Sequence, residues 1–417
     1  MRVPVLPLLI FFAAASACES DDTNGLGDGG IPTDQGLPPD DAGVTDAEAK
    51  DASSPDQGPT DLGAPDLGFR PGCETARFRP APADPTLTGP WTVGVRTATV
   101  AGLRTEIWYP AAPGTEAGAP AVRYDLRRAL PDSEQSKIAD ADTPFLDCDC
   151  YRDLPLDPEW GPYPVIVFVH GTAGVRYQSL PQMTHWASRG FVVVSADFPG
   201  LYLKDLLITT CGQGLPMQDN VGNLTRLLAA LRAPSEGLAF LAGRIDGRLG
   251  LSGHSAGGNA ISGFGDQAQV MAPLASRGVA DGQALESVLI MGGTSDRVVA
   301  ASVQREGYRG APSPKRLVLL ENAGHLAFSV FCDLRNPAGE NIVEAARARG
   351  VCGLALAGAL FDCNDSYLAD PEAWTVINHA TTAAFEETLQ CREAASRELS
   401  DTASRFPNRV GSFEEDL

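Results

Sequence analysis

One serine of this 417-residue chain stands in a local pattern that suits covalent catalysis. Residues 253–258 read Gly-His-Ser-Ala-Gly-Gly, with an apolar run before them and a Gly- and Ala-rich helix start after them. A G-x-S-x-G pattern between a strand and a helix holds its serine on a tight turn, with the side-chain oxygen exposed at the edge of the sheet. Small flanking residues allow the strand and the helix to approach closely. The pattern therefore predicts that Ser255 is a nucleophile.

A serine hydroxyl is a poor nucleophile until a base removes its proton, so a histidine and an acid must accompany it. Among the five histidines, only His325 follows Ser255 and ends an apolar run. Asp296 stands directly after the preceding run of this kind. The chain order Ser, Asp, His is that of the G-x-S-x-G hydrolases. We therefore predict a triad of Ser255, Asp296 and His325.

The tetrahedral intermediate of such a reaction needs donors for its oxyanion. One backbone N–H usually comes from the residue after the nucleophile, which is Ala256 here. The second comes from the loop after an earlier strand, where residues 168–174 read Phe-Val-His-Gly-Thr-Ala-Gly. The pattern assigns this second N–H to Thr172, and His170 is expected to pin the loop by hydrogen bonding.

The elements that must position these residues follow from short apolar runs. Runs at 165–169, 191–196, 247–252, 287–291 and 316–320 suit parallel strands that are buried on both faces. Helical segments are expected at 180–189, at 217–231 and from residue 255. Alternating segments at 91–95 and 105–110 indicate antiparallel strands. The expected fold is α/β, a doubly wound, mostly parallel sheet with antiparallel first strands, whose ligands bind at the carboxyl ends of the strands.

Taken together, these motifs resemble the α/β-hydrolase superfamily over residues 75–399. The resemblance is closest to the branch of platelet-activating-factor acetylhydrolases, dienelactone-hydrolase-like proteins and polyester-cleaving cutinases. It is carried by residues 170–174, 186–194, 253–258 and 323–328. It implies hydrolysis of carboxylic esters by the triad through an acyl-enzyme, without a metal or cofactor. The substrate would be a small-molecule, lipid or polymer ester.

Two segments depart from the pattern of this branch, and both flank the predicted catalytic loops. They are residues 124–163 and 332–374, which hold five of the nine cysteines. Because substrate walls are built from such segments, the substrate itself does not follow from the resemblance. Two alternatives stay open: a serine peptidase or amidase on the same fold, and an inactive surface protein that binds ligands.

The N-terminus predicts export. Residues 1–18 have a positive start and a short apolar run at 5–15, which is too short to span a bilayer. The ending Ala-Ser-Ala-Cys resembles a bacterial lipoprotein signal that attaches lipid to Cys18, and it also fits ordinary cleavage and secretion. Residues 19–72 hold 13 acidic and 2 basic side chains and are rich in Gly, Asp and Pro, which predicts a disordered tether. Residues 73–417 then form the catalytic domain. Lipidation would anchor it at the outer membrane or cell surface.

Charge and cysteine content limit the partners further. A net charge of −21 argues against nucleic acid and against a polybasic membrane contact, so any membrane attachment would be through the N-terminal lipid. Eight cysteines remain besides Cys18, and an even number in an exported chain predicts disulfides. Local bonds are expected among Cys332, Cys352 and Cys363. A metal site at Cys148 and Cys150 is the weaker reading, because no further ligand pattern accompanies it.

Overall fold

The computed structural model describes residues 76–212, 214, 216–354 and 361–417. The predicted signal (1–18), the tether (19–72) and Cys18 lie outside the described residues. Within the described part, no helix is both long enough and apolar enough to span a membrane.

Strands and helices alternate along much of the chain. The strands are β1 Val93–Val100, β2 Leu103–Pro110, β3 Ala121–Asp125, β4 Phe145–Arg152, β5 Tyr163–Val169, β6 Val192–Ala196, β7 Ile245–His254, β8 Val270–Leu274, β9 Ser287–Gly293, β10 Lys315–Leu320 and β11 Val410–Asp416. The α-helices are α1 Leu180–Ser188, α2 Leu203–Thr210, α3 Asn220–Arg232, α4 Ala256–Ile261, α5 Ala301–Gly310, α6 Ile342–Ala348, α8 Asp370–Leu389, α9 Glu393–Ser400 and α10 Thr402–Arg405. Short 3-10 helices are η1 Leu126–Ala129, η2 Gln135–Lys137, η3 Asp140–Asp142, η4 Glu236–Leu241 and η5 His325–Phe328.

The described strands form one sheet in the order β11-β10-β9-β8-β7-β5-β6-β2-β1-β4-β3. The neighbours from β6 through β5, β7, β8 and β9 to β10 are parallel. Antiparallel pairs lie toward the two sides, where β2 pairs with β1 and β6, β3 with β4, and β11 with β10. The molecule is thus an α/β protein with a large, mostly parallel sheet. The five predicted parallel strands correspond to β5, β6, β7, β9 and β10, and the antiparallel start corresponds to β1 and β2.

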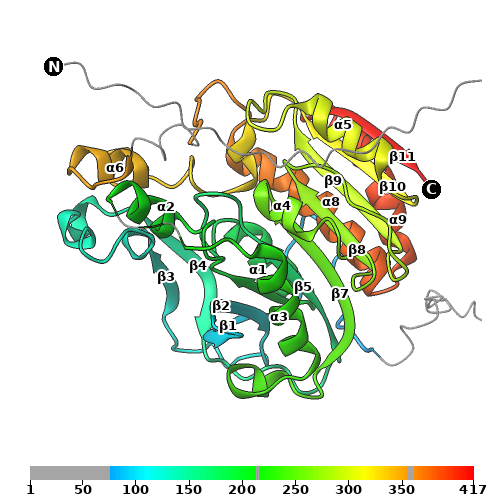
Figure 1. Ribbon diagram of the computed structural model, residues 1–417. Coiled ribbons are helices and arrows are strands. Elements are labelled where there is room, and N and C mark those ends of the chain that lie inside the picture. The colour runs from blue at the N-terminus through cyan, green and yellow to red at the C-terminus, as the bar shows by residue number, and fades with distance from the viewer. Residues whose placement is uncertain (1–75, 213, 215, 355–360) are drawn as a thin grey trace, which may run out of the picture. The chain divides into compact units, whose positions relative to one another are not determined.

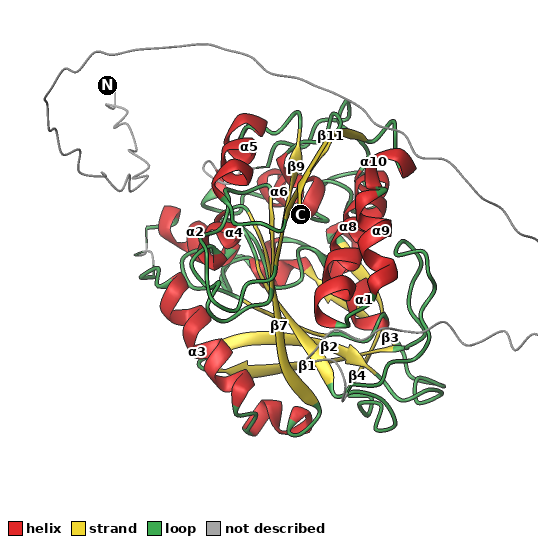
Figure 2. Cartoon of the chain, turned by 90° about the vertical axis from the view of Figure 1, so that its right-hand side faces the viewer, coloured by secondary structure: helices red, strands yellow, loops and turns green. Residues whose placement is uncertain are grey.

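Helices cover both faces of this sheet (Figure 1). Side chains alternate along each buried strand, so β5 sends Ile166 and Phe168 to one face and Val165 and Val167 to the other. The first face packs against α1, α8 and α9, and the second against α3, α4 and α5. Figure 2 shows these two helix layers on opposite sides of the sheet. Burial on both faces explains why the parallel strands are continuous apolar runs.

Strand β8, Val270–Leu274, is not among the predicted strands. Its sequence contains Pro273, which lacks the N–H that a central strand normally donates. In the ladder between β8 and β9, Met271 pairs with Val288 and Leu274 pairs with Met291, and the two β8 residues between them have no partner in β9. The sheet therefore tolerates the proline by leaving a local gap, which a reading of strand propensity does not anticipate.

Candidate active site

Ser255 lies on the turn between β7 and α4, at the carboxyl end of the parallel sheet. Its backbone has φ 55° and ψ −118°, which is a strained conformation for a residue other than glycine. The turn is held by hydrogen bonds from Ser255 N–H to the Leu274 oxygen and from Ser276 Oγ to the Ser255 oxygen, each 2.9 Å. Such strain clusters at functional sites, and Ser255 is partly exposed.

The glycines around Ser255 are required by close backbone contacts. A Cβ atom on Gly257 would lie 2.0 Å from the Val169 oxygen and 2.6 Å from the His170 oxygen. A Cβ atom on Gly253 would lie 2.6 Å from the backbone of Gly257. Only glycine fits at these distances, so the sequence pattern brings the serine turn directly against the loop that follows β5.

Asp296 and His325 meet at the same edge of the sheet. Asp296 follows β9 and His325 follows β10, and these strands are parallel neighbours. His325 Nδ1 lies 2.8 Å from Asp296 Oδ2, and the two residues are only 4% and 6% exposed. Because the carboxylate accepts this hydrogen bond, the Nδ1 atom carries the proton and Nε2 is left as the basic nitrogen.

Asp296 is held in place by three further hydrogen bonds. Its Oδ1 accepts from the N–H groups of Val298 and Val299, each at 2.8 Å. Its Oδ2 also accepts from Nε2 of Gln304, a fully buried residue of α5, at 3.3 Å. Sequence reasoning missed Gln304. Its position on α5 is decided by packing, since a Cβ atom on Gly292 would overlap the Gln304 side chain.

Ser255 and His325 are connected through His254. His254 Nε2 lies 2.9 Å from the His325 backbone oxygen, and the two imidazole rings are 4.7 Å apart between centroids. Among the described residues, no hydrogen bond joins Ser255 Oγ to the His325 ring. In enzymes without bound substrate such hydrogen bonds are often long and tighten only in the complex.

The loop after β5 lies beside the serine turn. A Cβ atom on Gly171 would lie 3.2 Å from Ser255 Cβ, and Ala173 adopts φ 61°. Thr172 is exposed. Within the described part of the chain, the amides of Thr172 and Ala256 donate to no other residue. Both remain available to a ligand.

His170 links this loop to the end of β6. Its Nδ1 lies 2.9 Å from the Gly171 oxygen, and its Nε2 accepts a 2.9 Å hydrogen bond from Phe198 N–H. Burial lowers the pKa of His170, so the ring stays neutral and can donate through Nδ1 while it accepts through Nε2. This geometry suits the pinning role that the sequence assigns to His170.

A buried ion-pair cluster anchors the far end of the same loop. Arg176 donates to Asp197 Oδ2 at 2.7 Å and to Glu106 Oε2 at 3.1 Å, and its own N–H donates to Asp197 Oδ1 at 2.9 Å. All three residues are buried. Removing one member of such a cluster leaves a buried charge without a partner, which is strongly destabilising. No local sequence pattern points to this cluster, since Glu106 comes from β2.

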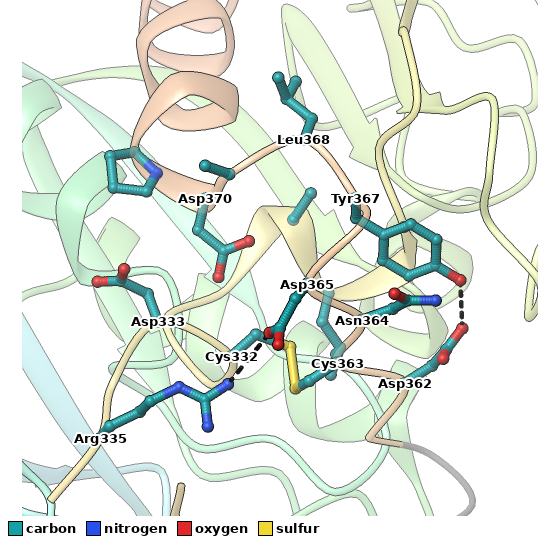
Figure 3. Close-up of a pocket in the computed structure, with 15 residues that line it drawn as sticks. Cys332, Asp333, Arg335, Asp362, Cys363, Asn364, Asp365, Tyr367, Leu368 and Asp370 are labelled. Carbon is teal, nitrogen blue, oxygen red and sulfur yellow. Dashed lines mark hydrogen bonds and ion pairs between the residues drawn. A yellow bond between two sulfur atoms is a disulfide. The ribbon is translucent and has the colours of Figure 1, made fainter. Parts of the chain in front are cut away.

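A cavity of about 360 Å³ lies next to the His325 loop (Figure 3). Gly324, Leu326 and Ala327 line one side, and the rest comes from residues 332–335 and 362–371. Its walls are acidic, with four aspartates and one arginine: Asp333, Asp362, Asp365, Asp370 and Arg335. Burial raises the pKa of Asp370 to about 7, and nearby Asp333 contributes to this shift.

Residues 124–163 and 332–374, the two segments in which the sequence departs from the resemblance, contact each other. Arg349 pairs with Asp142 at 2.8 Å, Lys137 Nζ donates to the Gly350 oxygen at 2.9 Å, and Cys352 N–H donates to Glu134 at 2.8 Å. Segment 332–374 also lines the cavity beside His325. Residues 332–374 therefore lie beside the His325 loop, and residues 124–163 contact them.

Disulfides form as expected, but not all of them are local. Cys148 pairs with Cys150 and Cys332 with Cys363, whereas Cys352 pairs with Cys211 at the end of α2. The expectation of local bonds after His325 is therefore right for Cys332 and Cys363 and wrong for Cys352. Cys391 is also disulfide-bonded. Since Cys148 and Cys150 bond to each other, neither thiolate is free for a metal, and no metal-binding group of side chains occurs among the described residues.

No protein-family model matches the chain, and no curated protein matches it. What characterises the site is its geometry: a strained serine, a buried Asp–His pair and two backbone N–H groups lie at one edge of a parallel sheet.

Proposed function

We propose that the chain is an α/β-hydrolase that cleaves carboxylic esters through an acyl-enzyme on Ser255. The observation that carries this proposal is the 2.8 Å contact between His325 Nδ1 and Asp296 Oδ2 at the sheet edge that also holds Ser255. A buried acid hydrogen-bonded to a histidine, near a serine on a strained turn, is the arrangement that serine hydrolysis requires.

Each step of the proposed reaction is assigned to a group at this edge of the sheet. His325 Nε2 takes the proton from Ser255 Oγ as the oxygen attacks the ester carbonyl carbon. The amides of Thr172 and Ala256 donate to the oxyanion, and Asp296 stabilises the imidazolium. Collapse of the intermediate releases the alcohol, which takes the proton from His325. Water then attacks the acyl-enzyme by the same route and releases the carboxylic acid.

Labelling with a fluorophosphonate probe, followed by a panel of short-chain p-nitrophenyl esters and aminoacyl-anilides, tests the proposal. We expect wild-type protein to label and to cleave the esters, and Ser255→Ala to lose on the order of 10⁴-fold or more in kcat. Absence of labelling would favour an inactive binding protein, and faster cleavage of the anilides would favour a peptidase. A Ser255→Ala variant of unchanged activity would refute the assignment.

We further propose that Cys18 carries the lipid that anchors the protein outside the cytoplasm. The proposal is supported by the short apolar run at 5–15, the cysteine that ends the signal, and the acidic tether after it. Several acyl chains on one cysteine anchor a protein stably. Cys18→Ala should therefore move the protein from the membrane fraction to the soluble fraction. An intact mass without lipid on Cys18 would contradict the anchor and leave secretion.

A further inference from the structure

A buried chain of hydrogen bonds connects three loops of the candidate active site through Gln178 and His254. Gly171 N–H donates to Gln178 Oε1 at 3.4 Å, and Gln178 Nε2 lies 3.1 Å from His254 Nδ1. His254 Nε2 then lies 2.9 Å from the backbone oxygen of His325. Gln178 and His254 are 1% and 3% exposed, and neither takes part in the proposed proton transfers.

The groups at the two ends of this chain of hydrogen bonds determine where each proton within it lies. The Gly171 amide can only donate, and the His325 carbonyl can only accept. Gln178 must therefore turn its oxygen to Gly171 and its NH₂ group to His254 Nδ1, which accepts. The single proton of His254 must then lie on Nε2 and point to the His325 carbonyl. Burial, together with neighbouring His325, lowers the pKa of His254 to about 3, so the ring keeps this neutral form.

We propose that Gln178 and His254 are positioning residues that set the oxyanion loop, the serine turn and His325 at their working distances from one another. The inference rests on the proposed function. The three loops follow different strands, β5, β7 and β10, and beyond the strand ends the sheet ladder no longer fixes them. The hydrogen bonds of Gln178 and His254 join all three loops through side chains.

A second set of hydrogen bonds connects Gln178 and Ser179 to the residues that follow His325. The Gln178 backbone oxygen accepts from Val330 N–H at 2.8 Å, and Ser179 Oγ donates to the Phe328 oxygen at 2.6 Å. Gln178 therefore contacts the His325 side of the site through its backbone and the oxyanion side through its side chain. A displacement of the oxyanion loop would therefore displace the residues around His325, and the reverse.

The experiment compares Gln178→Met and His254→Leu with a matched control, Gln182→Met. Gln182 lies in α1 and is fully buried, and its side-chain nitrogen and oxygen have no hydrogen-bond partner among the described residues. We expect Gln178→Met and His254→Leu to lose about 10- to 100-fold in kcat, with KM changed less than about threefold, because misplacement affects the transition state more than substrate binding. Gln182→Met should keep the wild-type kcat.

Two further variants separate positioning from general stability. His254→Gln retains one acceptor and one donor, so it should recover most of the kcat that His254→Leu loses. The double variant Gln178→Met/His254→Leu should be little worse than the poorer single variant, because both break one connection. Should His254→Leu fail to fold, Gln178→Met and His254→Gln still decide the question.

The outcomes distinguish this inference from the proposed function. Wild-type protein that neither labels with fluorophosphonate nor cleaves any ester of the panel overturns both. Wild-type protein that labels, with a Gln178→Met variant of unchanged kcat, overturns the positioning role alone. Equal losses in Gln178→Met and Gln182→Met would likewise overturn it, since burial rather than the hydrogen bonds would then be responsible.

Discussion

Replacing Asp296 with asparagine changes one atom of the candidate triad, and the structure determines how the new side chain must lie. Asp296 Oδ1 accepts from two backbone N–H groups, those of Val298 and Val299, each at 2.8 Å. Both donors require an acceptor, so the amide oxygen of asparagine must take this place. Its NH₂ group then occupies the position of Oδ2 and faces His325 Nδ1 and Gln304 Nε2.

An NH₂ group at that position can only donate, so His325 Nδ1 must become an acceptor and its proton must move to Nε2. Nε2 then has no lone pair to take the proton of Ser255. The same exchange in a known Ser-His-Asp triad costs about 10⁴-fold in kcat, and we expect a loss of about 10²- to 10⁴-fold here. This corresponds to roughly 3–5 kcal/mol of transition-state stabilisation. Because the pair is buried, water cannot readily replace the lost acceptor.

The assay is kcat for a short-chain p-nitrophenyl ester, normalised to the fraction of protein that labels with fluorophosphonate over long exposure. Asp266→Asn and Asp281→Asn are matched controls, since both aspartates are exposed and accept only from backbone N–H groups of nearby loops. Both should retain wild-type kcat. An Asp296→Asn variant within about threefold of wild type, a range far below a triad loss, would refute the reasoning. Loss of activity in Asp266→Asn, Asp281→Asn or Asp333→Asn instead would assign the acid elsewhere.

Three further predictions concern stability and are measured by urea unfolding. Gly257→Ala places a Cβ atom 2.0 Å from a β5 carbonyl oxygen, so it should lower the free energy of unfolding by at least about 1–3 kcal/mol and remove most of the activity. The control Gly263→Ala has open space around its Cβ position and should change the free energy of unfolding little. The pKa of Asp370 is about 7 in the folded protein and about 4 in the unfolded chain, so ionisation of this carboxyl destabilises the fold increasingly as pH rises from 4 to 7. Asp370→Asn should therefore raise the free energy of unfolding by up to a few kcal/mol at pH 8 and hardly at pH 4. A difference that does not depend on pH would contradict this. Replacing both Cys332 and Cys363 with serine opens a loop of sequence separation 31 and should lower the free energy of unfolding by about 3 kcal/mol, with a smaller effect on kcat. An unchanged midpoint of urea unfolding would show that the disulfide does not constrain the unfolded chain.

The sequence by itself determined the parts of this protein that depend on local patterns. The turn at Ser255 is encoded within six residues: Gly253 permits the close contact between β7 and the helix that directly follows it, and Gly257 permits the contact with β5. The strands β5, β6, β7, β9 and β10 are apolar runs because both of their faces are buried. Since parallel strands end at one edge, the positions of Asp296 and His325 after two such runs were sufficient to predict that they meet.

The tertiary structure alone decided the contacts that join distant parts of the chain. Gln178 and Gln304 are ordinary helix or loop residues in the sequence, and only packing turns them toward His254 and Asp296. The pairing of Cys352 with Cys211 spans 141 residues and has no local signal. Strand β8 is stabilised by neighbours on both sides in spite of Pro273. Short-range patterns specify which residues can do chemistry, whereas the distances among them depend on side chains that come together only when the sheet has formed.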